Sequence, residues 1–412
     1  MSSLGTIIND KLSMASSSAG ALYLKRYVNP CDDTSIPVDG VPDGQTHMIY
    51  TLNNKFNISI DQDTFVDPRA VVPDLYNNFT IIATPWSTYP ILIYGTFTWY
   101  NTVDKTSSSQ TCIMGVKDPN WQQNQEDFNL GRGLFRGCTL KWAGNTNNMQ
   151  GLIYGIQVPY CVDTMYTTSG SVESQDLSYQ AFNSYMNPYI PLDSNAITSY
   201  SPKYKVFNVP DGCYMPQHLS YGYKNYYRPP IFQKKQLDTG DSYEYFINGL
   251  LGSASAQMNI FDYDTWMSKR IFTKVMLPIE VTEYVPSFLH TGFNFGIIRV
   301  EGSNFNNPFT LKICNGYELV PSYNSEYFPL LKNPPLLDEQ ALYACAILTQ
   351  SLDFCYPSSY NDFQTMWNGV VDFWNKFKRS WNSETVQNIA TAASAIPGVS
   401  PWVQGINTLT KF

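Results

Sequence analysis

The sequence predicts a mainly β protein, an antiparallel sandwich with a large surface insertion and a helical region near its C-terminal end. Three observations predict this class. From residue 48 onward, short runs of β-branched and aromatic residues alternate with Pro, Gly, Asn and Asp. A stretch rich in Tyr, Ser, Asn and Pro interrupts these runs over 163–248. Near Asp338 the hydrophobic period changes from that of a strand to that of a helix.

The composition indicates a folded chain that associates with copies of itself. Its 412 residues include 15% charged and 15% aromatic residues, whereas an average soluble domain has about 25% charged residues. So little charge favours surfaces that are hidden inside an assembly. The formal net charge of -8 excludes a general polyanion binder. Residues 1–19 lack the features of a signal peptide, and no apolar run reaches the ~20 residues that span a bilayer.

Five segments follow along the chain. We take 1–47 as an N-terminal arm and lead-in, 48–162 as the first part of the sandwich, and 163–248 as an outer insertion that buries little aliphatic surface. The sandwich resumes over 249–335, and 336–412 forms a helical region. Strands are expected at Phe56–Ile60, Phe79–Thr84, Ile91–Tyr100, Met149–Val158, Ile271–Val281, Phe293–Val300 and Phe309–Leu319.

The helical region is predicted in two parts. Asp338 and Glu339 stand in the first turn of a helix, where its dipole favours negative charge. After a break at Ser358–Asp362, a second helix is strongly amphipathic. Its apolar side carries Phe363, Trp367, Val370, Val371, Trp374, Phe377 and Trp381.

The cysteines, histidines and paired acids give little sign of a metal or disulfide centre. Eight cysteines are scattered without a C-x-x-C pair, which favours buried free thiols. The three histidines stand apart, so a histidine metal site is not expected. The acidic pairs Asp61/Asp63 and Asp262/Asp264 can supply oxygen ligands for calcium between subunits, although solvated loop acids are the commoner outcome. No cofactor is therefore assigned.

Several colinear motifs resemble the capsid proteins of insect nodaviruses (alphanodavirus-like). These are Leu24–Asp33, Gly40–Asp43, Thr80–Gly95, Pro334–Leu342 and Ala390–Val399. The resemblance implies an eight-stranded antiparallel jelly-roll sandwich whose C-terminal helical region lies on the inner side of an icosahedral shell. It also implies that many copies enclose an RNA genome in a virion assembled in the host cytoplasm.

The same resemblance implies self-cleavage of each chain after Asn361, promoted by Asp32. The Asn side-chain amide attacks its own main-chain carbonyl and expels the next residue, and a desolvated carboxyl can stay protonated to assist. The chain is then at most a single-turnover, self-cleaving enzyme. In the alternative reading, Asp32 belongs to a turn after Pro30, and Asn361 with Asp362 caps a helix. Asp362 departs from the family, which has a small neutral residue there.

Two further roles are implied by the resemblance. The family carries an arginine-rich arm before the jelly roll, whereas residues 1–24 of this sequence hold only Asp10 and Lys11 as charges. Either the arm is missing, or RNA contact falls to other residues such as Lys25, Arg26, Lys376, Lys378 and Arg379. A solvated helix face is the alternative for 376–379. The released peptide 362–412 would act on a host membrane, whereas before release its aromatic face would pack against neighbouring subunits.

A second class of function stays open at this point. A non-viral β-sandwich that binds carbohydrate or protein would also use exposed Tyr residues, which stack on sugar rings. A dedicated hydrolase is not supported, because the sequence has no Gly-x-Ser-x-Gly elbow, phosphate-binding loop or paired-His signature.

Overall fold

The fold is seen in a computed structural model of the chain. The elements run in the order α2 (Ser18–Val28), β1 (Tyr50–Ile60), α3 (Gln62–Phe65), β2 (Tyr76–Ala83), β3 (Ile91–Asn101), β4 (Thr106–Val116), β5 (Phe128–Trp142), β6 (Leu152–Val158), α5 (Ser194–Tyr200), β7 (Lys205–Asn208), η3 (Val209–Asp211), β8 (Cys213–Pro216), β9 (Ile260–Asp262), α7 (Tyr263–Lys269), β10 (Phe295–Asn304), β11 (Phe309–Pro321), η5 (Phe328–Leu330), α8 (Glu339–Ser351) and η6 (Ser358–Asn361), where η marks a 3-10 helix. The structure describes residues 15–32, 37–70, 76–85, 89–119, 128–144, 150–158, 191–200, 203–219, 260–273, 292–304, 308–321 and 323–361.

The described strands form two sheets whose pairing order is that of a jelly roll. One sheet has the order β1-β11-β5-β8 and the other β7-β6-β10-β2-β3-β4-β9. If β3, β4 and β9 are set aside, eight strands remain: β1, β2, β5, β6, β7, β8, β10 and β11. Numbered one to eight in this chain order, they pair as 1-8-3-6 in the first sheet and 5-4-7-2 in the second. This is the arrangement of two interlocked Greek keys. The predicted eight-stranded antiparallel jelly roll is therefore confirmed.

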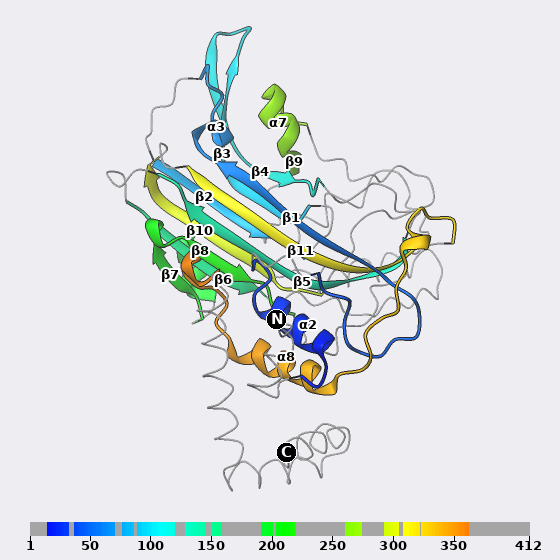
Figure 1. Ribbon diagram of the computed structural model, residues 1–412. Coiled ribbons are helices and arrows are strands. Elements are labelled where there is room, and N and C mark those ends of the chain that lie inside the picture. The colour runs from blue at the N-terminus through cyan, green and yellow to red at the C-terminus, as the bar shows by residue number, and fades with distance from the viewer. Residues whose placement is uncertain are drawn as a thin grey trace, which may run out of the picture.

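Three strands extend the second sheet beyond that pattern. β3 and β4 form a long antiparallel hairpin that projects from the top of the molecule in Figure 1. β9 pairs with β4 in parallel through only three residue pairs. The sequence analysis expected a strand at Ile91–Tyr100, which matches β3, and assigned no role to the hairpin.

The core between the sheets follows from the two-residue period of the strands. In β11, Phe309, Leu311 and Ile313 are buried between the sheets, whereas Thr310 and Lys312 point the other way. Trp266 of α7 closes one end of this core, where its indole N–H donates to the main-chain oxygen of Thr64 at 2.7 Å. Burial of these aliphatic and aromatic side chains is the main stabilising term.

Helices α2 and α8 cover the outer face of the four-stranded sheet (Figure 1). Apolar side chains of both helices share one cluster with residues of β5, β8 and β11. The hydroxyls of Tyr27 on α2 and Thr349 on α8 hydrogen-bond each other. The predicted helix start at Asp338 is confirmed, since Asp338 is the N-cap of α8. The segment 1–47, interpreted as an arm, instead contributes α2 to this helical layer.

One segment and one strand expected from the sequence differ from the structure. The range 163–248, taken as one outer insertion, contains β7 and β8, which pair inside the two sheets. These strands have four residues each, too few for a recognisable alternation of apolar and polar positions. No strand is described over 271–273, and the rest of the strand expected at Ile271–Val281 lies outside the described residues.

Candidate functional site

Asp32, the predicted cleavage-promoting residue, lies buried after the end of α2. Its carboxylate Oδ2 is 2.7 Å from Nζ of Lys25, and the side chains of Asp32 and Lys25 are 6% and 2% exposed. Arg26 donates from Nη1 to the main-chain oxygen of Asp32 at 2.8 Å. The turn sits directly on β5, because a Cβ at Gly137 would lie 2.5 Å from Cγ of Pro30. Glycine at 137 thus allows the turn to approach the sheet.

The ion pair changes the chemistry expected of Asp32. The predicted role requires a protonated carboxyl that donates to the scissile carbonyl. A carboxylate that faces a buried ammonium at 2.7 Å instead carries its negative charge, because the pair stabilises both ions. With Lys25 at this distance the Asp32 carboxylate is placed to accept a proton, while its role in cleavage stays a prediction from the resemblance.

Residues 352–361, which we call the strap, follow α8 and end at the predicted cleavage residue Asn361. Tyr356 pairs with Tyr214 of β8 through two main-chain hydrogen bonds of 2.7 and 2.8 Å. Cys355 is buried, and Ser358 donates its hydroxyl hydrogen to the main-chain oxygen of Asp211 at 2.8 Å. The strap thus lies beside β8, the last strand of the four-stranded sheet.

Tyr214 joins the two halves of the candidate site. Its hydroxyl donates to Oδ1 of Asn29 at 2.5 Å, in the turn that carries Asp32, while its main chain pairs with Tyr356 in the strap. Burial raises the pKa of the Tyr214 hydroxyl well above its usual value, so the hydroxyl stays protonated. The structure therefore brings the segments of Asp32 and Asn361 to one strand, although the side chain of Asn361 is not among those described.

The predicted RNA and membrane residues divide into buried, half-buried and undescribed ones. The ammonium of Lys25 is buried and paired with Asp32, so in this structure it is not exposed to contact a phosphate. The guanidinium of Arg26 lies 5.7 Å from the centroid of the Phe135 ring. The other candidates fall outside the described residues: Asp362, Phe363, Trp367, Val370, Val371, Trp374, Lys376, Phe377, Lys378, Arg379 and Trp381. Across the described ranges, no helix is both long and apolar enough to cross a membrane.

The acidic pairs considered for calcium serve as helix caps. Asp61 accepts from the main-chain N–H of Thr64 at the start of α3, and Asp262 accepts from that of Thr265 at the start of α7. Both carboxylates thus have a local structural role. Within the described part of the chain, no cluster of three or more His, Cys, Asp or Glu residues is placed to hold a metal ion.

The predicted buried thiols are confirmed for the described cysteines. Burial raises the pKa of the Cys112 and Cys138 thiols to about 12, which leaves them protonated and unreactive at neutral pH. Cys161 lies outside the described residues. The free, buried cysteines are Cys31, Cys112, Cys138, Cys213, Cys314, Cys345 and Cys355.

Asp338 joins the two helices of the layer. Besides the N–H of Ala341 in α8, its carboxylate accepts the main-chain N–H groups of Ser16 and Ser17 and the Ser17 hydroxyl, at 2.7 to 3.1 Å. Burial raises the pKa of Asp338, but the hydrogen bonds from Ser17, Ala341 and Ser16 outweigh it and hold the pKa below its usual value. From the sequence Asp338 is expected only as a first-turn acid, because Ser16 and Ser17 lie more than 300 residues away along the chain.

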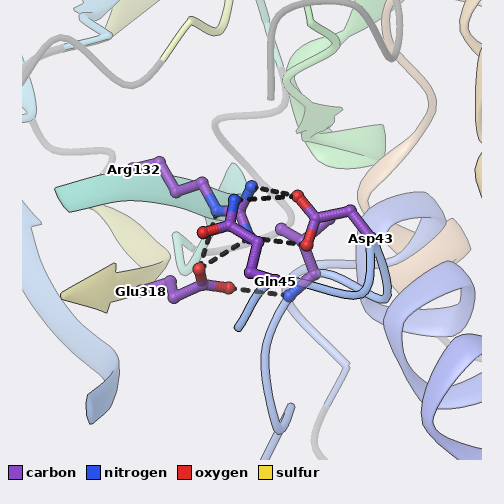
Figure 2. Close-up of polar contacts among 5 residues, drawn as sticks. Asp43, Gln45, Arg132 and Glu318 are labelled. Carbon is purple, nitrogen blue, oxygen red and sulfur yellow. Dashed lines mark hydrogen bonds and ion pairs between the residues drawn. The ribbon is translucent and has the colours of Figure 1, made fainter. Parts of the chain in front are cut away.

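A buried ionic network ties the N-terminal segment to the four-stranded sheet (Figure 2). The guanidinium of Arg132 on β5 lies between two carboxylates. Its Nη1 is 2.6 Å from Oδ2 of Asp43, which precedes β1, and its Nη2 is 2.6 Å from Oε1 of Glu318 on β11. Glu318 also accepts the main-chain N–H of Val41 at 2.8 Å. Burial raises the pKa of Glu318 although Arg132 opposes the shift. This network is not predictable from the sequence, since no local pattern links positions 43, 132 and 318.

Comparison with known proteins gives structural neighbours without a sequence relative. No protein-family model matches the chain, and no curated protein matches it. A chain of the T13 particle of infectious bursal disease virus is 10% identical with a TM-score of 0.41, covering 90% of this chain and 99% of that chain. The VP2 subviral particle of the same virus gives 10% identity, a TM-score of 0.40 and coverages of 84% and 99%.

A third neighbour is the 60-mer BFDV capsid protein, at 10% identity and a TM-score of 0.25, covering 67% of this chain and 96% of that chain. At these TM-scores the likeness adds nothing to the fold, which the pairing order of the strands already establishes. The resemblance to nodavirus capsid proteins stays a prediction from the sequence motifs.

Proposed function

We propose that the chain is a viral capsid protein whose copies associate into a closed shell, as part of the virion. The observation that carries this proposal is a row of exposed apolar side chains along one connector of a sandwich whose described strands already enclose a buried core. Jelly rolls serve in capsids and also in lectins and cupins, so the fold alone does not choose among these functions. Exposed apolar side chains that are grouped on one part of a surface favour association with another protein surface.

The apolar residues in question lie on and beside the connector 323–337 between β11 and α8. Tyr323 and Leu336 are 86% and 84% exposed. Ile49 and Lys332 exchange two main-chain hydrogen bonds of 2.9 Å, which brings Met48 against the connector. We call this set the connector patch, and it consists of Met48, Tyr323, Phe328, Leu330, Leu336 and Leu337.

A second copy of the chain is the partner that the composition favours. With 15% charged residues, the chain has few charges to keep its surface soluble as a single subunit. Copies that bury the connector patch against each other satisfy this requirement through closed symmetry.

Substitution within the connector patch should abolish assembly. In the double variant Tyr323→Asp/Leu336→Asp, two carboxylates would have to be buried in the contact, so we expect particles to be replaced by single subunits in analytical ultracentrifugation. Val103, which is 85% exposed on the β3–β4 hairpin, provides the matched control Val103→Asp, expected to assemble normally. A double variant that assembles like the wild type contradicts the proposal. A wild-type chain that stays monomeric and is retained on a column carrying sugar or peptide ligands supports a binding module.

The proposal extends to RNA enclosed by the shell and to assembly in the host cytoplasm. Support comes from the nodavirus resemblance alone, because Lys25 is buried and Lys376, Lys378 and Arg379 lie outside the described residues. Particles treated with nuclease should retain protected RNA, and particles without nucleic acid would remove this part of the proposal.

We also propose self-cleavage after Asn361, with release of a membrane-active peptide 362–412. The side-chain amide nitrogen of Asn361 attacks its own main-chain carbonyl carbon, a succinimide forms, and the bond to Asp362 breaks as its nitrogen takes a proton and leaves. Support comes from Tyr214, which connects the turn of Asp32 and the strap to one strand. Asp32, as a charged acceptor, would take the proton from the attacking amide.

Cleavage is tested by the intact mass of the chain recovered from particles. Two fragments that divide between Asn361 and Asp362 are expected, and Asn361→Ala should yield one uncut chain. Asp32→Asn should slow the cleavage by about 100-fold or more, as the loss of a general base does. Cleavage at the wild-type rate in Asp32→Asn would remove Asp32 from the mechanism. Liposome leakage caused by particles but not by Asn361→Ala particles would establish the membrane role.

A further inference from the structure

His218 is a buried histidine that the functions proposed above do not use. It follows β8, where its main-chain N–H donates to Oε1 of Gln157 at 2.9 Å and its main-chain oxygen accepts from Asn294 at 2.8 Å. The residue is 1% exposed. Neither ring nitrogen has a hydrogen-bond partner among the described residues. Buried polar atoms are nearly always paired, so this ring is an exception that calls for an explanation.

The strap packs against this ring. The Phe354 ring meets the imidazole edge-on, with 6.1 Å between centroids and 60° between planes. Gln157, which holds the main chain of His218, also donates from Nε2 to the main-chain oxygen of Phe354 at 2.7 Å. Phe354 also contacts Lys203, whose Nζ is 5.3 Å from the ring centroid. One aromatic side chain of the strap thus contacts both the imidazole and an ammonium.

The charged and titratable groups around His218 give an imidazolium little support. Lys203, in the segment before β7, carries a like charge. The acid of the strap, Asp353, is 56% exposed and is paired with Lys205 at 3.1 Å. From α2, the neutral hydroxyl of Tyr27 accepts the main-chain N–H of Leu219. Burial first, and Lys203 second, lower the pKa of His218 to about 4.

We propose that His218 is an acid-sensitive latch, whose protonation releases the strap from the sandwich. A protonated His218 ring has no hydrogen-bond acceptor here, so it needs contact with water. Of the segments packed against the ring, the strap is the one whose displacement costs the least free energy. Gln217 donates its main-chain N–H to Arg136 and its side-chain amide to the main-chain oxygens of Ala83 and Asn294, and Asn294 donates its main-chain N–H to His218. The strap is joined to the sandwich by one isolated bridge at Tyr356 and by single hydrogen bonds at Phe354 and Ser358, rather than by a continuous strand pairing.

The sign of the pH effect follows from the lowered pKa. An opened strap lets His218 titrate near its ordinary value of 6.5, whereas in the closed state it takes up a proton only near 4. Opening is therefore favoured progressively as the pH falls from 6.5 to 4, and it is unaffected above 7. Between pH 7.5 and pH 5.0 the opening equilibrium constant should rise about 30-fold.

Hydrogen exchange of the full-length chain tests the latch directly. After correction for the pH dependence of intrinsic exchange, peptides that cover the strap should exchange about 30-fold faster at pH 5.0 than at pH 7.5, because exchange follows the opening equilibrium. The amide of Tyr356, bonded to Tyr214, is the reporter. Peptides from β1, which β11 and β5 separate from β8 in the sheet, should keep one rate at both pH values.

Two variants separate the latch from general acid sensitivity. His218→Phe fills the buried site without a titratable group, so the strap should lose its pH response, whereas His47→Phe should retain it. If His218→Phe does not fold, Lys203→Met serves instead, since loss of the like charge raises the pKa of His218 and should weaken the response. A strap that still opens on acidification in His218→Phe, or a wild-type strap that is equally protected at both pH values, overturns the proposal. The readout needs no particle, so failure of assembly does not affect it.

Discussion

Arg132→Met should lower the free energy of unfolding by about 3 to 5 kcal/mol, as the removal of one partner from a buried ion pair does. The substitution leaves Glu318, 3% exposed, as a buried carboxylate without its cation. It also releases Asp43 from the sheet, and with it the segment that leads from α2 into β1. Urea unfolding of the unassembled double variant Tyr323→Asp/Leu336→Asp provides a background in which this free energy is measurable.

The pH dependence of the stability and a control variant show whether the lost network causes the destabilisation of Arg132→Met. Since burial already raises the pKa of Glu318, loss of Arg132 should raise it further, so Arg132→Met should become more stable as the pH falls from 7 toward 5. Lys332→Met, which removes an ion pair between side chains 35% and 55% exposed, should cost at most about 1 kcal/mol. Equal costs for Arg132→Met and Lys332→Met would show that the network does not stabilise the fold.

Asp338→Ala should cost about 3 kcal/mol, because it removes a helix cap and leaves main-chain donors at the start of both helices without their acceptor. Those donors are the N–H groups of Ser16, Ser17 and Ala341. Asp193→Ala is the matched control, since Asp193 accepts a similar bond from Ala196 in an exposed position and should cost about 1 kcal/mol or less. Thermal unfolding followed by circular dichroism measures both.

The same contact predicts an acid effect and a second variant. Because the folded-state pKa of Asp338 lies below its usual 3.8, its stabilisation is complete above that pH and is lost as the pH falls through the folded-state value. Gly20→Ala should destabilise the layer too, since a Cβ at Gly20 would lie 2.2 Å from Oδ2 of Asp338. If Asp338→Ala were as mild as Asp193→Ala, the junction of α2 and α8 would have to be held by apolar contacts alone.

The strands that the sequence predicts best are those with a long two-residue period. β11 begins at Phe309 as expected, and β3 begins at Ile91. The four-residue β7 and β8 were absorbed into the insertion, because a strand of that length is specified by its partners rather than by its own pattern. α2 was read as an arm although Ser17 caps it and Ala21, Leu24 and Val28 recur at helical spacing.

The sequence motifs name the residues of the candidate site but not the charge that faces Asp32. The motifs singled out Asp32 and Asn361, and the structure connects their segments through Tyr214. Burial of Asp32 was expected, yet the ion pair with Lys25 was not, because Lys25 had been assigned to RNA. Which buried charge faces which partner depends on packing between α2 and the sheet, and no local pattern in the sequence encodes that.

The mass of the purified full-length chain in solution tests the central claim, that this jelly roll forms a shell with copies of itself. Light scattering should give particles of many subunits with a narrow size distribution, visible as closed shells by negative-stain microscopy. A constant mass of 46.8 kDa, that of one chain, over a wide range of protein concentration, salt and pH would contradict it.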